Sequence, residues 1–104
     1  ALSRIPDLPR YYLTMDIDVL DPSLAPGTGS PEPDGLPYRY VKQIVSEVAE
    51  RFEIVGFDLV EVNPYLDPAQ VTALVGARLA VETIGAIFHG RTGELRRNRH
   101  EQDC

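Results

Sequence analysis

The sequence predicts an α/β fold in which a parallel sheet is covered by helices, arranged as three αβα layers. Apolar runs rich in β-forming residues stand at 11–15 and 54–60, and each is followed later by a segment with helical spacing of apolar residues. A strand–helix–strand unit with apolar strands is typical of a parallel sheet with helices on both faces. Ligands of such sheets bind beyond the carboxyl ends of the strands, and acidic residues follow both runs.

The first predicted strand is Tyr11–Met15, which ends at Asp16. A loop dense in proline and glycine follows it, from Asp21 to Pro37. Loops of this length without structure of their own are often functional. The same composition also suits a flexible linker.

The segment Tyr38–Phe52 is predicted to be a helix, because its apolar residues recur at spacings of three and four. The second strand, Ile54–Val60, is followed by a stop at Asn63-Pro64.

A second helix is expected to run to about Phe88, with Asp67 as its cap, Pro68 at its first position and Gln70 closing a capping box. Its apolar window contains Arg78 and Glu82, which favours a buried helix over a membrane span. We therefore expect one domain at 1–90 and a polar, disordered tail at 91–104.

The charge and the cysteine content of the chain argue against some classes of function and location. The net charge is -6, and no basic face is evident, so nucleic-acid binding is not expected. The single cysteine, Cys104, cannot form an internal disulfide, which favours a reducing, cytoplasmic location. No membrane association is expected.

Three carboxylates stand close together at the end of the first strand: Asp16, Asp18 and Asp21. Residues i and i+2 of an extended chain point to the same side, so Asp16 and Asp18 could converge. Neighbouring anions repel, and a divalent cation with a preference for oxygen ligands would remove that repulsion. A solvated acidic turn with Asp21-Pro22 as turn chemistry is the alternative.

The segments 15–23 (MDIDVLDPS) and 25–31 (APGTGSP) resemble the late metal-binding signature of ureohydrolases, the arginase/agmatinase family. The segment 56–64 (GFDLVEVNP) is similar to the family's second landmark, and Asp67 with Thr72-Ala73 continues the likeness. The resemblance covers about residues 10 to 88, and the Pro-Gly-Thr-Gly loop is closer to agmatinases than to arginases. It implies an arginase-like αβα fold, of which this chain is the C-terminal part.

The resemblance also implies roles for individual residues. Asp16 would bridge the metals of a binuclear Mn²⁺ centre, and Asp18 would bind one of them. Glu61 would pair with the guanidinium of the substrate, and Ser30 would lie in the substrate loop where the family often has threonine. Asp21 would hold the loop turn. Asp58, three residues before Glu61, would point to the other side of the strand and have a structural role.

The chain departs from the family pattern in two ways. The earlier motifs that supply histidine ligands and the acid/base histidine are not in this sequence, so it offers no catalytic residue of its own. The histidines present, His89 and His100, match no family position. Tyr40 stands where the family usually has glutamate after arginine.

The implied function is manganese-dependent hydrolysis of a guanidino compound such as agmatine to an amine and urea, as part of a longer ureohydrolase that assembles as a trimer or hexamer. This chain alone is expected to be inactive. One alternative is a truncated or remnant subunit without turnover. A haloacid-dehalogenase-like phosphatase would also place Asp-x-Asp after a strand, but Leu20 stands where its threonine or serine is expected.

Overall fold

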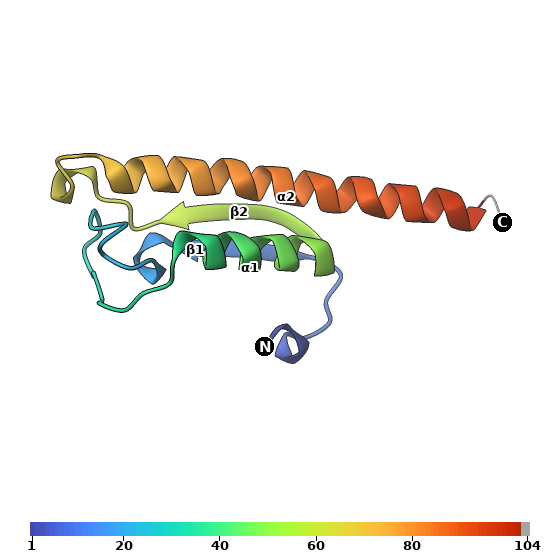
Figure 1. The fold of residues 1–104 in the computed structure, drawn as a ribbon. Coiled ribbons are helices and arrows are strands. Elements are labelled where there is room, and N and C mark those ends of the chain that lie inside the picture. Colours follow the sequence, from blue (N-terminus) through green and yellow to red (C-terminus); the bar gives the residue numbers. More distant parts are fainter. Residues whose placement is uncertain (103–104) are drawn as a thin grey trace.

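The computed structural model describes the backbone of residues 1–102 and the side chains of residues 1–93. Its main elements follow in the order β1 (Tyr11–Asp16), α1 (Tyr38–Arg51), β2 (Ile54–Val60) and α2 (Val71–Gln102). Short 3-10 turns lie at Leu2–Arg4 (η1), Ile17–Val19 (η2) and Pro64–Leu66 (η3). The strands pair in parallel, and the helices run alongside them (Figure 1). The predicted strands, first helix and parallel sheet are confirmed.

Both helices pack against the same face of the sheet. The face of β1 that carries Leu13 and Met15 joins the core with Val41 and Val45 of α1 and Leu79 of α2. Alternate residues point to the opposite face, where Tyr12 is 62% exposed. Within the described residues, the expected helix layer on that second face is absent. A crossover helix and the helix after the next strand share a face unless the strand order reverses, and a sheet of two strands has no reversal.

The core is small and centres on the carboxyl half of β1. Ile17, Leu20 and Leu79 are at most 1% exposed. The buried side of α1 carries Val41, Val45 and Ala49, four residues apart, as a helix packed on one stripe requires. At the helix–helix contact, Lys42 of α1 lies 3.4 Å from the carboxylate of Glu82 on α2.

Helix α2 is longer than expected. It continues past Phe88 to Gln102, where the sequence predicted a disordered tail from residue 91. The tail contains arginine, glutamate and glutamine and no proline, so its residues favour helix once the preceding turns are formed.

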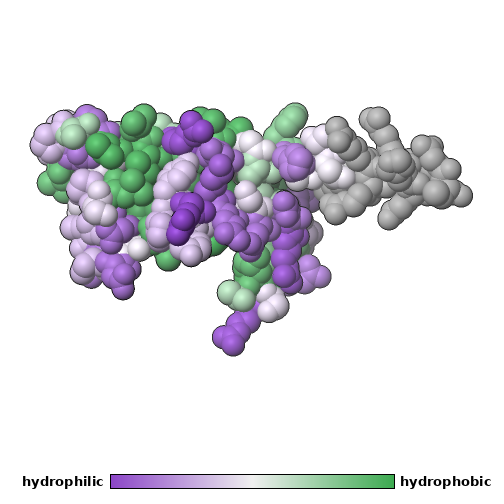
Figure 2. All heavy atoms as spheres, in the orientation of Figure 1, coloured by the Kyte–Doolittle hydropathy of each residue, from purple (hydrophilic) through white to green (hydrophobic). Residues whose placement is uncertain are grey.

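The outer side of α2 is apolar and exposed, so the expectation of a buried helix holds for one side only. Leu74, Val81, Ile84 and Phe88 are 57–73% exposed, and apolar side chains gather at the surface on the α2 side of the molecule (Figure 2). The stretch Val71–Gly93 is long and apolar enough to cross a membrane by length and composition, with a mean hydropathy of 1.6, and 22% of its apolar window is buried.

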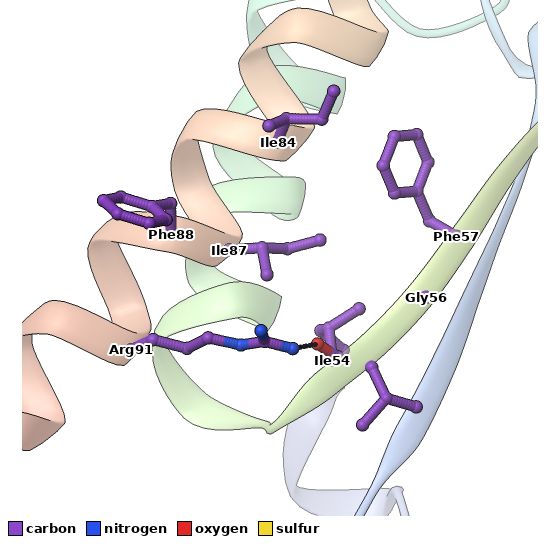
Figure 3. A pocket seen from close by; sticks show the side chains of 8 residues that line it. Ile54, Gly56, Phe57, Ile84, Ile87, Phe88 and Arg91 are labelled. Carbon is purple, nitrogen blue, oxygen red and sulfur yellow. Dashed lines mark hydrogen bonds between the residues drawn. The ribbon is translucent and has the colours of Figure 1, made fainter.

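An apolar groove of about 390 Å³ lies between α2 and the first half of β2. Figure 3 shows Ile84 and Ile87 directed from the helix toward Phe57 of the strand, while the Phe88 ring extends to the other side of the helix at the rim of the groove. Arg91 closes one end by donating a hydrogen bond to the carbonyl of Ile54 (3.0 Å). The groove is far from the carboxyl end of β2, and β2 has no strand on its outer side among the described residues.

Helix α2 is anchored at its start by a buried carboxylate. Asp67, 3% exposed, accepts a hydrogen bond from the backbone N–H of Thr72 (2.7 Å). The Thr72 backbone and hydroxyl hydrogen bonds hold the pKa of Asp67 below its ordinary value. The Asp67 side chain therefore caps the first turn of α2, but the expected helix start with Pro68 at its first position and the capping box at Gln70 are wrong. The helix begins at Val71, and Gln70 precedes it with a left-handed φ of 59°.

The first prediction concerns association. An unpaired strand edge beside exposed apolar side chains favours pairing with another chain. The weight-average sedimentation coefficient of the purified chain is expected to rise with concentration. Phe88→Lys should weaken association roughly tenfold or more, because it removes about 1.5–3 kcal/mol of apolar burial. Tyr65→Lys, 95% exposed and outside the groove, is the control. A monomer at all concentrations would contradict this.

The second prediction concerns acid stability. Because the folded-state pKa of Asp67 is lowered, its ionised form stabilises the fold above the unfolded pKa of about 3.9, and that contribution is lost as pH falls through the folded pKa. Asp67→Asn should lower the urea concentration at which half of the protein is unfolded at neutral pH. As the pH falls into the acid range, this midpoint should decrease less in Asp67→Asn than in wild type. The matched control is Asp7→Asn, which changes an exposed carboxylate. If the urea midpoints of wild type and Asp67→Asn decreased equally as the pH is lowered, ionised Asp67 would not stabilise the fold.

Candidate active-site edge

The parallel register brings the acidic segments after both strands to one edge of the sheet. Asp16, the last residue of β1, pairs with Val60, the last residue of β2. Asp18 and Glu61 therefore follow neighbouring strand ends, as the sequence predicted for a ligand site.

Asp16 and Asp18 approach each other through a turn. The chain leaves β1 at Asp16 and enters η2, and the Asp16 carboxylate accepts a hydrogen bond from the backbone N–H of Asp18 (3.0 Å). The extended geometry assumed from the i, i+2 spacing is wrong here, because Asp18 lies in the 3-10 turn. The two carboxyl groups nevertheless lie near each other, because the Asp16 side chain is among the groups that raise the pKa of Asp18.

Negative charge is concentrated around Asp18. Partial desolvation raises the pKa of Asp18 most, followed by its hydrogen bond with the Asp16 carboxylate and by the charges of Asp16, Glu61 and Glu32. The charges of Asp16, Glu61 and Glu32 thus lie near enough to Asp18 to disfavour its ionised form. Glu32, which the sequence reasoning did not single out, belongs to this environment.

The carboxylates fit a divalent cation but do not complete a site for one. Their oxygens are the hard ligands that Mn²⁺ and Mg²⁺ accept, and a cation would relieve the repulsion that raises the Asp18 pKa. Among the residues that the structure describes, no group of three or more His, Cys, Asp or Glu side chains could hold a metal ion together. The chain therefore offers part of a coordination shell.

Glu61 stands at the same edge in a strained backbone conformation. Its φ of 70° lies in the left-handed region, which costs a non-glycine residue about 1–2 kcal/mol. Such residues cluster at functional sites. The turn ends β2 and exposes the Glu61 side chain beside an open cleft of about 440 Å³, which Gly29 and residues 61–65 line.

The loop opposite Glu61 is held at its base by Asp21. The Asp21 carboxylate accepts hydrogen bonds from the backbone N–H of Ser23 (2.9 Å) and of Gly35 (3.1 Å), and from the Ser23 hydroxyl. These bonds lower the pKa of Asp21, the Ser23 bonds most. Leu20 and Leu36 form a parallel bridge that closes the loop. The structural role expected for Asp21 is confirmed.

The structure places Ser30 on the exposed part of this loop, directly after Gly29 of the cleft. Sequence reasoning missed Thr28, which is 2% exposed and has a hydroxyl with no hydrogen-bond partner. It also missed the contact of Gly27 with α2, where the Gly27 N–H donates to the Thr72 hydroxyl (2.7 Å). Neither has a sequence signal beyond small residues in a loop.

Asp58 points away from the core, as its spacing from Glu61 predicted. On the second face of the sheet, it accepts a hydrogen bond from the Thr14 hydroxyl across the strands (2.6 Å). Desolvation and the Asp58 charge raise the pKa of Tyr12 on the same face. The other residues that depart from the family pattern lie outside this edge. His89 is exposed, and the Arg39 guanidinium lies 5.3 Å from the centre of the Tyr40 ring. The His100 side chain is outside the described residues.

Comparison with known proteins agrees with this geometry. The family described as "Arginase family" matches residues 1–85. An agmatinase from Sodalis glossinidius is 52% identical over 73 residues, which are 70% of this chain and 24% of the relative. The chain thus spans about a quarter of the length of the curated relatives it matches.

Solved structures share the fold. Proclavaminate amidino hydrolase from Streptomyces clavuligerus superposes with a TM-score of 0.71 and 37% identity, covering 76% of this chain and 26% of that one. Arginase from Bacillus caldovelox gives a TM-score of 0.61 and 42% identity, covering 74% and 24%. The fold of this chain is therefore shared with solved arginase-like structures, and the chain belongs to the arginase family.

Proposed function

We propose that this chain supplies one wall of a manganese-dependent ureohydrolase site, in which Asp16 and Asp18 hold metal and Glu61 binds the guanidinium of the substrate. The observation that carries the proposal is the parallel register that brings these three carboxylates to one sheet edge. Relatives named agmatinase and proclavaminate amidino hydrolase act on amidino-type compounds by their names, which supports a guanidino substrate such as agmatine.

Each residue has a distinct task in this proposal. Asp16 and Asp18 present oxygen ligands from the end of β1 and the turn that follows. When bound, manganese supplies an activated water for attack on the guanidinium carbon. Glu61, across the cleft from Gly29, offers a planar carboxylate that suits the parallel hydrogen bonds of a guanidinium. Ser30 adds a hydroxyl from the loop beside it.

The alternatives receive less support. A haloacid-dehalogenase-like phosphatase does not account for Glu61, and Leu20 is 1% exposed in the core. A non-enzymatic subunit that binds metal would use Asp16 and Asp18 in the same way. Unlike an enzyme, it would not need Glu61 to bind a substrate.

The third prediction separates metal binding from stability. Asp18→Asn removes a carboxylate from a crowded edge, so the metal-free chain should unfold at a higher Tm than wild type. Millimolar Mn²⁺ should raise the wild-type Tm by about a few degrees and raise that of Asp18→Asn much less. Differential scanning calorimetry with and without Mn²⁺ measures both effects.

Glu50→Gln changes an exposed carboxylate on α1 and should keep the wild-type response to Mn²⁺. If Asp18→Asn and Glu50→Gln respond alike to Mn²⁺, the metal does not bind at the β1 edge.

The fourth prediction concerns Glu61. A chimera that carries this chain in place of the matching stretch of the Sodalis agmatinase is expected to release urea from agmatine. Glu61→Gln in the chimera should lower kcat/KM roughly tenfold to a hundredfold, because a charge-assisted hydrogen bond contributes about 1.5–3 kcal/mol. Bound manganese, assayed in parallel, should be unchanged.

Glu53→Gln, an exposed glutamate before β2, is the matched control for the chimera. Unchanged kcat/KM in Glu61→Gln would remove Glu61 from the substrate site. Loss of manganese would instead make Glu61 a ligand or a structural residue. A chimera that holds metal without turnover would favour the non-enzymatic alternative.

A further inference from the structure

We propose that Thr72 is a positioning residue that holds the loop carrying Gly29 and Ser30 against Glu61. The proposal rests on the proposed function, because it assigns the cleft between them to the substrate. Its basis is a chain of short backbone contacts through Gly27, which joins the loop to α2 on one side and to the segment after β2 on the other.

The first contact joins the loop to the start of α2. The backbone N–H of Gly27 donates to the Thr72 hydroxyl at 2.7 Å, and Thr72 is fully buried. The Asp67 carboxylate accepts the Thr72 backbone N–H at 2.7 Å, and the Thr72 side chain contributes to the lowered pKa of Asp67. The Thr72 hydroxyl oxygen is therefore held beside the Asp67 carboxylate while it accepts the Gly27 N–H.

The second contact joins the same glycine to the segment that carries Glu61. The carbonyl of Gly27 accepts a hydrogen bond from the backbone N–H of Asn63 at 2.7 Å. Gly27 is two residues from Gly29, and Asn63 is two residues from Glu61. Because Gly29 and Glu61 line the same cleft, this pair of bonds determines how far apart the two walls lie.

The packing around Gly27 leaves no room for adjustment. A Cβ at position 27 would lie 2.8 Å from the Asp67 Cβ and 2.8 Å from the Thr72 hydroxyl oxygen. The backbone of the loop therefore approaches α2 as closely as glycine permits. Without the Thr72 oxygen, the buried Gly27 N–H would lose its partner and the loop would have to move to reach water.

Variants at Thr72 distinguish positioning from helix capping. Thr72→Val keeps the side-chain shape and the backbone N–H bond to Asp67, and it removes only the hydroxyl. Thr72→Ser keeps the hydroxyl. Thr83→Val is the matched control, because Thr83 is also a fully buried threonine of α2 but its hydroxyl bonds to the Leu79 carbonyl within the helix.

Amide hydrogen exchange of the whole chain, followed by NMR, tests the contact itself. In Thr72→Val the amides of Gly27 and Asn63 should exchange roughly tenfold faster or more, with the middle of α2 unchanged. Thr72→Ser and Thr83→Val should keep the wild-type rates at both amides. Unchanged exchange at Gly27 in Thr72→Val would overturn the proposal, as would equal acceleration throughout α2.

Titration with agmatine and with Mn²⁺ in the same samples tests the consequence. Agmatine should shift the amides of Gly29 and Glu61 in wild type and Thr72→Ser, with an affinity weaker by about threefold or more in Thr72→Val. Mn²⁺ broadening at Asp16 and Asp18 should be equal in all of them. Equal agmatine affinity in Thr72→Val and Thr72→Ser would overturn the positioning role.

The outcomes also separate this proposal from the proposed function. If wild type responds to neither probe, the proposed function fails, whatever the exchange rates show. If Thr72→Val does not fold, Gly27→Ala provides the second test, because its methyl group displaces the loop while Thr72 and Asp67 stay intact. Gly27→Ala should then accelerate exchange at Asn63, and unchanged exchange there would contradict the proposal.

Discussion

The parallel hydrogen-bond register between β1 and β2 determines where every candidate site residue lies. Thr14 stands opposite Asp58 and Asp16 opposite Val60. A slip of one residue would move Asp16 to the helix-covered face and bury its charge among Met15 and Leu79. The cross-strand hydrogen bond from Thr14 to Asp58 reinforces the register two residues before Asp16. Strand pairing therefore brings Glu61 to the edge where the local turn after β1 holds Asp16 and Asp18 together.

The acidic edge combines crowded charge with a strained backbone, and both oppose folding. The pKa of Asp18 is raised by partial desolvation first and then by the carboxylates near it, and Glu61 occupies a left-handed conformation. Residues of this kind persist where the surrounding structure over-determines them. Here Asp21 closes the loop base and Asp67 anchors α2, and each has a pKa lowered by hydrogen bonds that favour its ionised form. The hydrogen-bonded carboxylates of Asp21 and Asp67 thus stabilise the backbone around Asp18 and Glu61.

The sequence predicted the parts of the structure that follow from local pattern. The apolar runs identified both strands, the three- and four-residue spacing identified α1, and the order of strands and acids placed the site at one edge. The sequence-based prediction was wrong for features that contacts beyond the local pattern determine. The turn at Asp18 replaces an extended chain, both helices lie on one face, and Gln70 takes a left-handed φ directly before α2. The Gly27–Thr72 contact joins positions 45 residues apart, which no local pattern reveals.

We propose that this edge of the sheet attracts a metal ion through Asp16 and Asp18. Paramagnetic broadening of backbone amide signals by substoichiometric Mn²⁺ tests it most directly. We expect broadening centred on residues 16–18 that extends to Glu61 and is lost in Asp16→Asn, while the acidic face of α1 at Glu47 and Glu50 keeps its signals. Broadening centred on α1, or broadening at residues 16–18 that survives Asp16→Asn, would contradict it.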